Sequence, residues 1–238
     1  MTETVAGASA PVALSLAGLS VMLAMPTHRD IPAQTVASLL GTADLMRSRG
    51  IPFECQLQVG GSIVTFARSK AAHCFLESDK TRLFWVDSDI VWKPEDFLHI
   101  LALSSALDCV GAIYPSKSEP ALFFLNYERE ELASNELGCF EVKGLGLGFT
   151  CVQRHVMEKL AERAPKLKFP DAREPIPHIF RLDSDGDEAR GEDMAFFADI
   201  KALGFPVWLD PNINLGHVGA KIYRGDFMSH LTKVPHDG

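Results

Sequence analysis

Residues 83–92 read LFWVDSDIVW, an apolar run that leads directly into two aspartates one residue apart, Asp87 and Asp89. An apolar run without alternation is typical of a strand buried on both faces, which is the usual state of strands in parallel sheets. In open α/β sheets, ligands bind beyond the carboxyl ends of such strands. The stretch therefore predicts an α/β protein with a binding site at the end of this strand.

The two aspartates place two negative charges close together, and their repulsion grows where water is excluded. A divalent cation is the simplest compensation. Hard oxygen ligands suit Mg²⁺ or Mn²⁺, which often share their coordination shell with substrate phosphates. Two other interpretations stay open for the pattern alone: Asp-x-Asp also occurs by chance in turns, and an aspartate after a strand can cap the next helix.

The composition excludes some classes of protein. The 238 residues are 47% hydrophobic and 23% charged, which is enough apolar material for one large α/β domain. The net charge of −8 disfavours a nucleic-acid-binding protein, since such proteins normally carry a basic surplus. The five cysteines are odd in number and no pair has zinc-site spacing, so we expect free thiols and a cytoplasmic protein.

The uncharged segment 5–25 has the length of a membrane span. It is, however, rich in Ala, Gly and Ser and contains Pro11, and Glu3 precedes it where a signal peptide carries Lys or Arg. We therefore expect no membrane span. Instead we expect a flexible leader over residues 1–18 and a single domain over residues 19–238.

Strands and helices alternate through the first half of the chain. Besides the strand that ends before Asp87, we expect strands at 19–25, 53–59 and 109–114, and helices at 30–50, 64–77 and from 94 onward. This alternation predicts a mainly parallel sheet with helical crossovers. The Gly-x-Gly-x-x-Gly and Gly-Lys-Ser/Thr fingerprints of dinucleotide and nucleoside triphosphate sites are absent from the sequence.

The second half has a different pattern. We expect antiparallel strands at 121–127 and 139–143, a strand at 149–152, a helix at 154–163 and irregular chain at 165–177. The acidic stretch 181–193 does not match the calcium-loop pattern, so we expect a solvated, mobile loop. A helix begins at Glu192 and Asp193 and ends at Gly204, and a strand follows at 206–209. His217 lies between glycines in a predicted loop, where it could be a metal ligand, a base or an ordinary loop histidine.

Four features follow one another in a set order: Asp-x-Asp after a buried strand, the glycine-rich segment 144–148, Gly-Glu-Asp at a helix start, and a late His-x-Gly. In this combination the chain resembles, over roughly residues 19–219, the GT-A-fold glycosyltransferases that depend on a metal and a nucleotide sugar. The resemblance implies an α/β fold with a mixed, mainly parallel sheet flanked by helices. It also implies transfer of a sugar from a nucleotide-diphosphate sugar to an acceptor hydroxyl, with Mn²⁺ or Mg²⁺ as cofactor.

The resemblance also implies roles for individual residues. Asp89 and His217 would bind the metal, and Asp87 would share the metal or contact the ribose. Asp193 would act as the catalytic base of an inverting enzyme, with Glu192 beside it in the catalytic group. The remaining residues would bind the donor nucleotide or its sugar: Pro26, Thr27, Arg29, Arg68, Asp87, Ser88, Gly146 and Gly148.

The implied partners are a UDP- or GDP-sugar as donor and a glycan, a lipid-linked molecule or a protein as acceptor. The Gln-x-x-Arg-Trp motif of processive enzymes is absent, which favours a single-step transferase. A sugar-nucleotidyltransferase and a non-catalytic nucleotide-sugar-binding module stay open as alternatives. The choice between inversion and retention is also open, because in a retaining enzyme Asp193 would only position the substrate.

Overall fold

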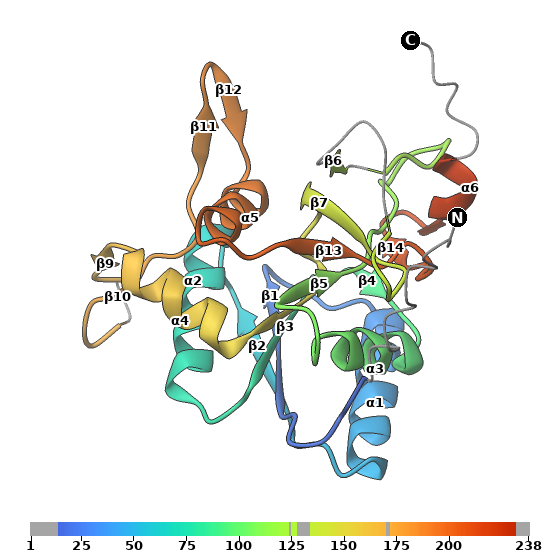
Figure 1. Ribbon diagram of the computed structural model, residues 1–238, viewed down its shortest axis with the longest axis horizontal. Coiled ribbons are helices and arrows are strands. Elements are labelled where there is room, and N and C mark those ends of the chain that lie inside the picture. The colour runs from blue at the N-terminus through green and yellow to red at the C-terminus, as the bar shows by residue number, and fades with distance from the viewer. Residues whose placement is uncertain (1–13, 124, 128–133, 170–171, 232–238) are drawn as a thin grey trace, which may run out of the picture.

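The computed structural model describes residues 14–123, 125–127, 134–169 and 172–231 (Figure 1). Its central sheet contains eight strands in the order β2 (Phe53–Val59), β1 (Val21–Thr27), β3 (Arg82–Val86), β8 (Phe149–Gln153), β5 (Cys109–Gly111), β13 (Val207–Leu209), β7 (Phe140–Gly144) and β6 (Asn126–Tyr127). Six of these eight strands point the same way, and only β8 and β7 run against them. The predicted mixed, mainly parallel sheet is therefore confirmed.

Helices cover both faces of this sheet (Figure 1). They are α1 (Ala33–Ser48), α2 (Val64–Glu77), α3 (Pro94–Leu103), α4 (Arg154–Arg163), α5 (Glu192–Ala202) and the short α6 (Phe227–Leu231). Helices α1 and α3 pack together on one face, while α2, α4 and α5 form the layer on the other. The apolar core is accordingly divided into two clusters, one on each side of the sheet.

Strand β3 has the double burial that its unbroken apolar sequence predicts. Leu83 and Trp85 pack in the cluster under α2, whereas Phe84 and Val86 pack in the cluster under α1 and α3. All four side chains are fully buried, because successive residues of a strand point to opposite faces and both faces are covered. The carboxyl end of β3, where Asp87 follows, thus rests on a rigid central strand.

The inner face of α1 contains polar residues. Its buried residues include Ser38, Thr42 and Met46, whereas Leu40 is 62% exposed. The cause is Trp92: its indole N–H donates to Thr42 Oγ1 at 2.8 Å, and its carbonyl accepts from Ser38 Oγ at 2.8 Å. The buried hydroxyls of Ser38 and Thr42 therefore have hydrogen-bond partners, whereas the buried Thr35 hydroxyl of the same helix has none among the described residues.

Some predicted segments need correction. The strand expected at 109–114 ends at Gly111, and the one expected at 121–127 is reduced to β6. The segment 165–177, expected to be irregular, contains a short ladder of β9 (Lys166–Leu167) and β10 (Ile176–Pro177). The acidic loop expected at 181–193 is largely a hairpin of β11 (Asp183–Asp185) and β12 (Glu188–Arg190), in which Gly186 adopts φ 59° at the two-residue turn.

A second, three-stranded sheet joins distant parts of the chain. It contains β15 (Ile222–Arg224), β14 (Gly216–Val218) and β4 (Ile90–Val91), all paired antiparallel. His217 therefore lies in a strand and not in the predicted loop, and it pairs directly with Ile90. This pairing brings the late His-x-Gly segment beside the Asp-x-Asp turn.

The predicted leader lies mostly outside the described residues, although Ser15 already contacts the body of the domain through Ser105 Oγ, at 3.2 Å from its backbone N–H. None of the five cysteines forms a disulfide. Among the helices that the structure describes, none is both long and apolar enough to cross a bilayer.

An ion pair between α3 and the loop after β13 makes the stability depend on pH. His99 Nε2 lies 2.8 Å from Asp210 Oδ2, and the Asp210 side chain is only 4% exposed. The hydrogen bond to Asp210 raises the pKa of His99 above 6.5. Burial opposes ionisation of Asp210, but hydrogen bonds from His99 and Asn212 outweigh it and lower the pKa of Asp210 below 3.8.

The stabilisation of the fold by protonated His99 is thus complete below pH 6.5 and is lost as the pH rises through the raised pKa of His99. The stabilisation by ionised Asp210 is lost only in acid, as the pH falls through the lowered pKa of Asp210. We expect His99→Gln to lower the free energy of unfolding by about 0.5 kcal/mol at pH 5.5 and by less at pH 8.5, since half-exposed His99 is screened by solvent. Urea denaturation of both proteins at the two pH values measures this. An equal loss at both would contradict the charged pair.

Candidate active site

The Asp-x-Asp turn follows the carboxyl end of β3 and leads into β4. The backbone N–H of Ile90 donates to the carbonyl of Asp87 at 3.1 Å, which closes the turn. The two carboxylates then take different partners. Asp87 Oδ1 accepts from Arg68 Nη2 at 2.9 Å, whereas Asp89 Oδ2 accepts from Lys117 Nζ at 2.5 Å.

Arg68 connects the Asp-x-Asp turn to the start of α5. Its side chain is 5% exposed, and its Nε lies 3.6 Å from Glu192 Oε1. The guanidinium therefore lies between the carboxylates of Asp87 and Glu192 and compensates both in a largely dehydrated place. Its Nε and Nη1 are buried and have no hydrogen-bond partner among the described residues, so the guanidinium keeps donors for another molecule.

His217 faces Asp89 from strand β14. Its Nδ1 lies 2.9 Å from the Pro115 carbonyl oxygen, which can only accept, so Nδ1 carries the hydrogen. Its Nε2 lies 3.4 Å from Asp89 Oδ2. When the ring is neutral, two acceptors point at each other there, and only a proton or a cation between them makes the arrangement favourable.

The pKa of Asp89 reflects these neighbours. Burial alone would raise it, but hydrogen bonds from the protonated form of His217 and from Lys117 outweigh the burial and lower the pKa to about 2. Asp89 is consequently ionised at every physiological pH. In many metal sites, a hydrogen bond from one ring nitrogen orients the histidine, and the other ring nitrogen binds the metal. His217 is oriented in this way by Pro115, and the anionic oxygen of Asp89 faces its other nitrogen.

Asp89 and His217 thus fit a divalent cation, because the Asp89 oxygen and the His217 Nε2 that face each other are both acceptors when the imidazole is neutral. Asp87, the third predicted metal ligand, is turned towards Arg68 instead. Across the part of the chain that the structure describes, no group of three or more His, Cys, Asp or Glu side chains is arranged to hold a metal ion. The protein would therefore supply two ligands, and water or substrate oxygens would have to complete the shell.

The glycine-rich segment leaves room for Tyr114 and Asp87. A Cβ on Gly148 would lie 2.7 Å from Asp87 Oδ2, and a Cβ on Gly146 would lie 2.4 Å from the Tyr114 hydroxyl oxygen. That hydroxyl lies 3.5 Å from Asp87 Oδ2. Burial raises the pKa of Tyr114 well above its ordinary value, so the hydroxyl keeps its proton and can donate it to the carboxylate. Glycine is required at both positions for this close approach.

Asp193 and His217 line a common pocket of about 360 Å³. The pocket is lined by Ile113, Tyr114, Pro115, Ser116, Lys117, Gly146, Asp193, Met194 and His217. Asp193 Oδ1 accepts from the backbone N–H of Met194 at 2.8 Å in the first turn of α5. Burial raises the pKa of Asp193, although its place at a helix N-terminus favours the ionised form.

The predicted nucleotide-binding residues lie at the end of β1. Pro26 and Thr27 are its last two residues, and Arg29 is exposed just beyond it. Thr27 Oγ1 is buried, and no described residue forms a hydrogen bond with it. Like Arg68 Nη1, this hydroxyl is a polar group that a ligand at the strand ends would satisfy. Ser88 is partly buried within the Asp-x-Asp turn.

The sequence analysis missed Tyr114 and Lys117. Tyr114 packs edge-on against His217 with ring centroids 5.1 Å apart, and Lys117 binds Asp89. Both follow the carboxyl end of β5, which lies in the same sheet as β3 and points the same way. The rule that selected Asp87 and Asp89 from the end of β3 therefore applies to them as well.

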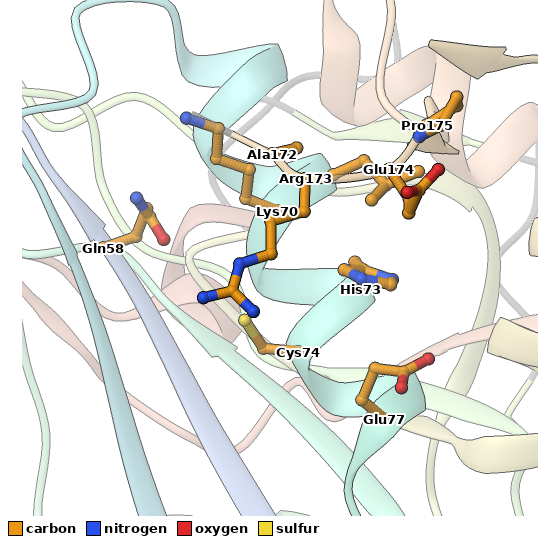
Figure 2. Close-up of a pocket in the computed structure, with 10 residues that line it drawn as sticks. Gln58, Lys70, His73, Cys74, Glu77, Ala172, Arg173, Glu174 and Pro175 are labelled. Carbon is orange, nitrogen blue, oxygen red and sulfur yellow. The ribbon is translucent and has the colours of Figure 1, made fainter. Parts of the chain in front are cut away.

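A second pocket, of about 550 Å³, lies against the exposed side of α2 (Figure 2). Its charged lining residues balance, since α2 contributes Lys70 and Glu77 and the loop before β10 contributes Arg173 and Glu174. Burial raises the pKa of the Cys74 thiol, which stays protonated near neutral pH and is then a poor nucleophile. The convergent polar groups lie instead at the Asp87 end of the sheet.

No protein-family model matches the sequence, and no curated protein matches it either. Among solved structures, the chain is similar to A197 from STIV, with a TM-score of 0.56 and 22% identity over 84% of this chain and 86% of that one. It is also similar to GalNAc-T7, solved with UDP, GalNAc and Mn²⁺, with a TM-score of 0.51 and 10% identity over 88% of this chain. The match spans 45% of the GalNAc-T7 chain.

A glycosyltransferase involved in glycosylation of the major capsid of PBCV-1 matches at 15% identity over 63% of this chain and 71% of that one; its TM-score of 0.31 is too low to support an argument. At such identities a structural likeness concerns the fold alone. The likeness to GalNAc-T7, together with the observed sheet, shows that the chain has a fold of the GT-A type.

Proposed function

We propose that the protein is a glycosyltransferase that moves a sugar from a nucleotide-diphosphate sugar to an acceptor hydroxyl in a single step. The observation that carries the proposal is the convergence of Asp89 and His217 beside a pocket that also holds Asp193. The pocket volume of about 360 Å³ lies within the range of small-molecule sites. Asp89 follows the carboxyl end of β3, and Tyr114 and Lys117 of the pocket follow the carboxyl end of β5.

The charge of the site supports a donor that arrives with a divalent cation. The carboxylates of Asp87, Asp89, Glu192 and Asp193 outnumber the cationic side chains of Arg68 and Lys117 by two. Asp89 and His217 would hold Mn²⁺ or Mg²⁺, which when bound would stabilise the charge that develops on the departing diphosphate. The nucleotide part would lie towards Thr27 and Arg68, where two buried polar groups await partners. A UDP- or GDP-sugar is the donor class we propose.

The acceptor side of the pocket has the base that the reaction needs. The Asp193 carboxylate takes the proton from the acceptor hydroxyl, whose oxygen forms the new bond to the anomeric carbon. The bond from that carbon to the diphosphate breaks, and the diphosphate leaves with the electron pair. Because burial raises the pKa of Asp193, the carboxylate is a stronger base than an exposed aspartate. Glycan, lipid-linked and protein hydroxyls all satisfy this chemistry.

The first test is a thermal-shift screen of UDP-, GDP-, CMP- and dTDP-sugars, each with and without Mn²⁺. We expect one nucleotide to raise the melting temperature strongly, and only when the metal is present, since a ligand of the native state stabilises it. Calorimetry then compares Asp89→Ala with Asp44→Ala, whose carboxylate is 71% exposed on α1. Asp89→Ala should abolish metal-dependent donor binding, and Asp44→Ala should leave it unchanged.

Unchanged affinity of Asp89→Ala for every donor would refute the metal site. Strong donor binding without any transfer, after prolonged incubation with glycan, lipid-linked and protein acceptors, would instead indicate a nucleotide-sugar-binding module. Release of pyrophosphate from a nucleoside triphosphate would indicate a sugar-nucleotidyltransferase.

A further inference from the structure

Lys117 occupies the place at which a metal ion would bind Asp89. Its Nζ lies 2.5 Å from Asp89 Oδ2, the same oxygen that faces His217 Nε2 at 3.4 Å. One oxygen of the Asp89 carboxylate therefore lies next to both the Lys117 ammonium group and the His217 imidazole. A divalent cation on that oxygen would lie within a few Å of the ammonium, and like charges at such a distance repel strongly where solvent is partly excluded.

Contacts with the backbone of Gly219 and with the β14–β15 hairpin hold Lys117 in position. A Cβ on Gly219 would lie 3.2 Å from Lys117 Cδ, so the aliphatic stem crosses the backbone of Gly219 closely. The loop that carries Lys117 is tied to the β14–β15 hairpin at both ends, by the hydrogen bond from His217 to Pro115 and by the ion pair of Glu119 with Lys221. The side chain nevertheless is 39% exposed, so its head group has open space to move into.

We propose that Lys117 is an internal cation that holds Asp89 while the site is empty and is displaced by the metal when the donor diphosphate arrives. The inference rests on the proposed function, because the diphosphate is what gives the released ammonium a new partner. A flexible four-carbon stem with three donors suits this exchange of a carboxylate for a phosphate. The metal alone would then bind weakly, and metal and diphosphate would strengthen each other's binding by the same factor.

The test measures Mn²⁺ alone, without nucleotide, by electron paramagnetic resonance titration of free Mn²⁺. We expect Lys117→Met to bind Mn²⁺ at least about tenfold more tightly than the natural protein, since the competing charge is gone. Lys117→Arg keeps the charge and should stay close to the natural protein. Lys159→Met, which removes an exposed lysine of α4, should also leave the affinity unchanged.

A double variant locates the metal. Adding Asp89→Ala to Lys117→Met should abolish the gained affinity, and an unchanged gain would show that the ion binds elsewhere and overturn the inference. Mn²⁺ affinity of Lys117→Met no higher than that of the natural protein, or no binding to either, would overturn it as well.

Failure of this inference is distinct from failure of the proposed function. Metal-dependent donor binding by the natural protein, combined with equal Mn²⁺ affinity of Lys117→Met, refutes only the role of Lys117. Tighter Mn²⁺ binding by Lys117→Met, combined with no binding of any nucleotide sugar, supports competition between Lys117 and the metal for Asp89 and refutes the proposed glycosyltransferase function.

Discussion

Asp193→Asn is expected to lower the turnover number by at least about a hundredfold while donor affinity is retained, as for the loss of a general base. The amide keeps the size of the side chain, but it cannot take the proton of the acceptor hydroxyl. Steady-state kinetics with the donor identified by thermal shift measures the turnover, and calorimetry measures donor binding.

The pH dependence separates this role from a structural one. Burial raises the pKa of Asp193 above the ordinary value of 3.8, and the base is active only above its pKa. The acidic limb of the turnover profile should therefore lie above pH 3.8 in the natural protein and be absent in Asp193→Asn. Asp187→Asn, at the exposed turn of the β11–β12 hairpin, is the matched control. Near-normal turnover of Asp193→Asn would indicate a retaining enzyme in which the donor phosphate takes the proton.

Arg68→Met should have the largest effect on stability. Methionine fills a similar space, but the carboxylates of Asp87 and Glu192 then lose their common cation. These carboxylates are 25% and 18% exposed, so the loss should lie at the lower end of the range for breaking a buried pair, about 3 kcal/mol. Urea denaturation measures the free energy of unfolding.

Two comparisons make this measurement specific. Arg47→Met removes an arginine whose pair with Asp44 is 81% and 71% exposed, and it should cost about 0.5 kcal/mol or less. Asp87→Asn should restore part of the stability when added to Arg68→Met, because it removes one uncompensated charge. If Arg68→Met cost no more than Arg47→Met, the cluster of Arg68, Asp87 and Glu192 would have no net stabilising effect.

The parts of the fold that could be predicted from the sequence are those with strong local patterns. Helices α2 and α4 lie within the predicted bounds, and β3 has the double burial that its apolar run indicates. The face of α1 could not be predicted, because it depends on hydrogen bonds to Trp92 from far along the chain. Strands of two or three residues such as β4 and β14 are held by their partners and leave too short a pattern to detect.

Residues of the candidate site could likewise be predicted only where they lie next to an element with a strong local pattern. The aspartates at the end of β3 and the acidic start of α5 could be selected because the first follow a recognisable strand and the second opens a recognisable helix. His217 could be placed beside Asp89 only by the resemblance, since nothing local specifies the pairing of β14 with β4. The inward turn of Asp87 to Arg68 and the contact of Lys117 with Asp89 arise from tertiary packing, and no spacing in the sequence indicates either of them.

The position of β8 has a consequence for synthesis of the chain. This strand lies between β3 and β5 although it comes after both in the sequence. While a ribosome is making the intervening segment, at roughly 5–20 residues per second, β3 has an unpaired apolar edge for several seconds. Such an edge can pair with other nascent chains. Slowing of translation between β5 and β8 would therefore lengthen the interval in which β3 can aggregate, whereas slowing after β8 would leave β3 already paired on both edges.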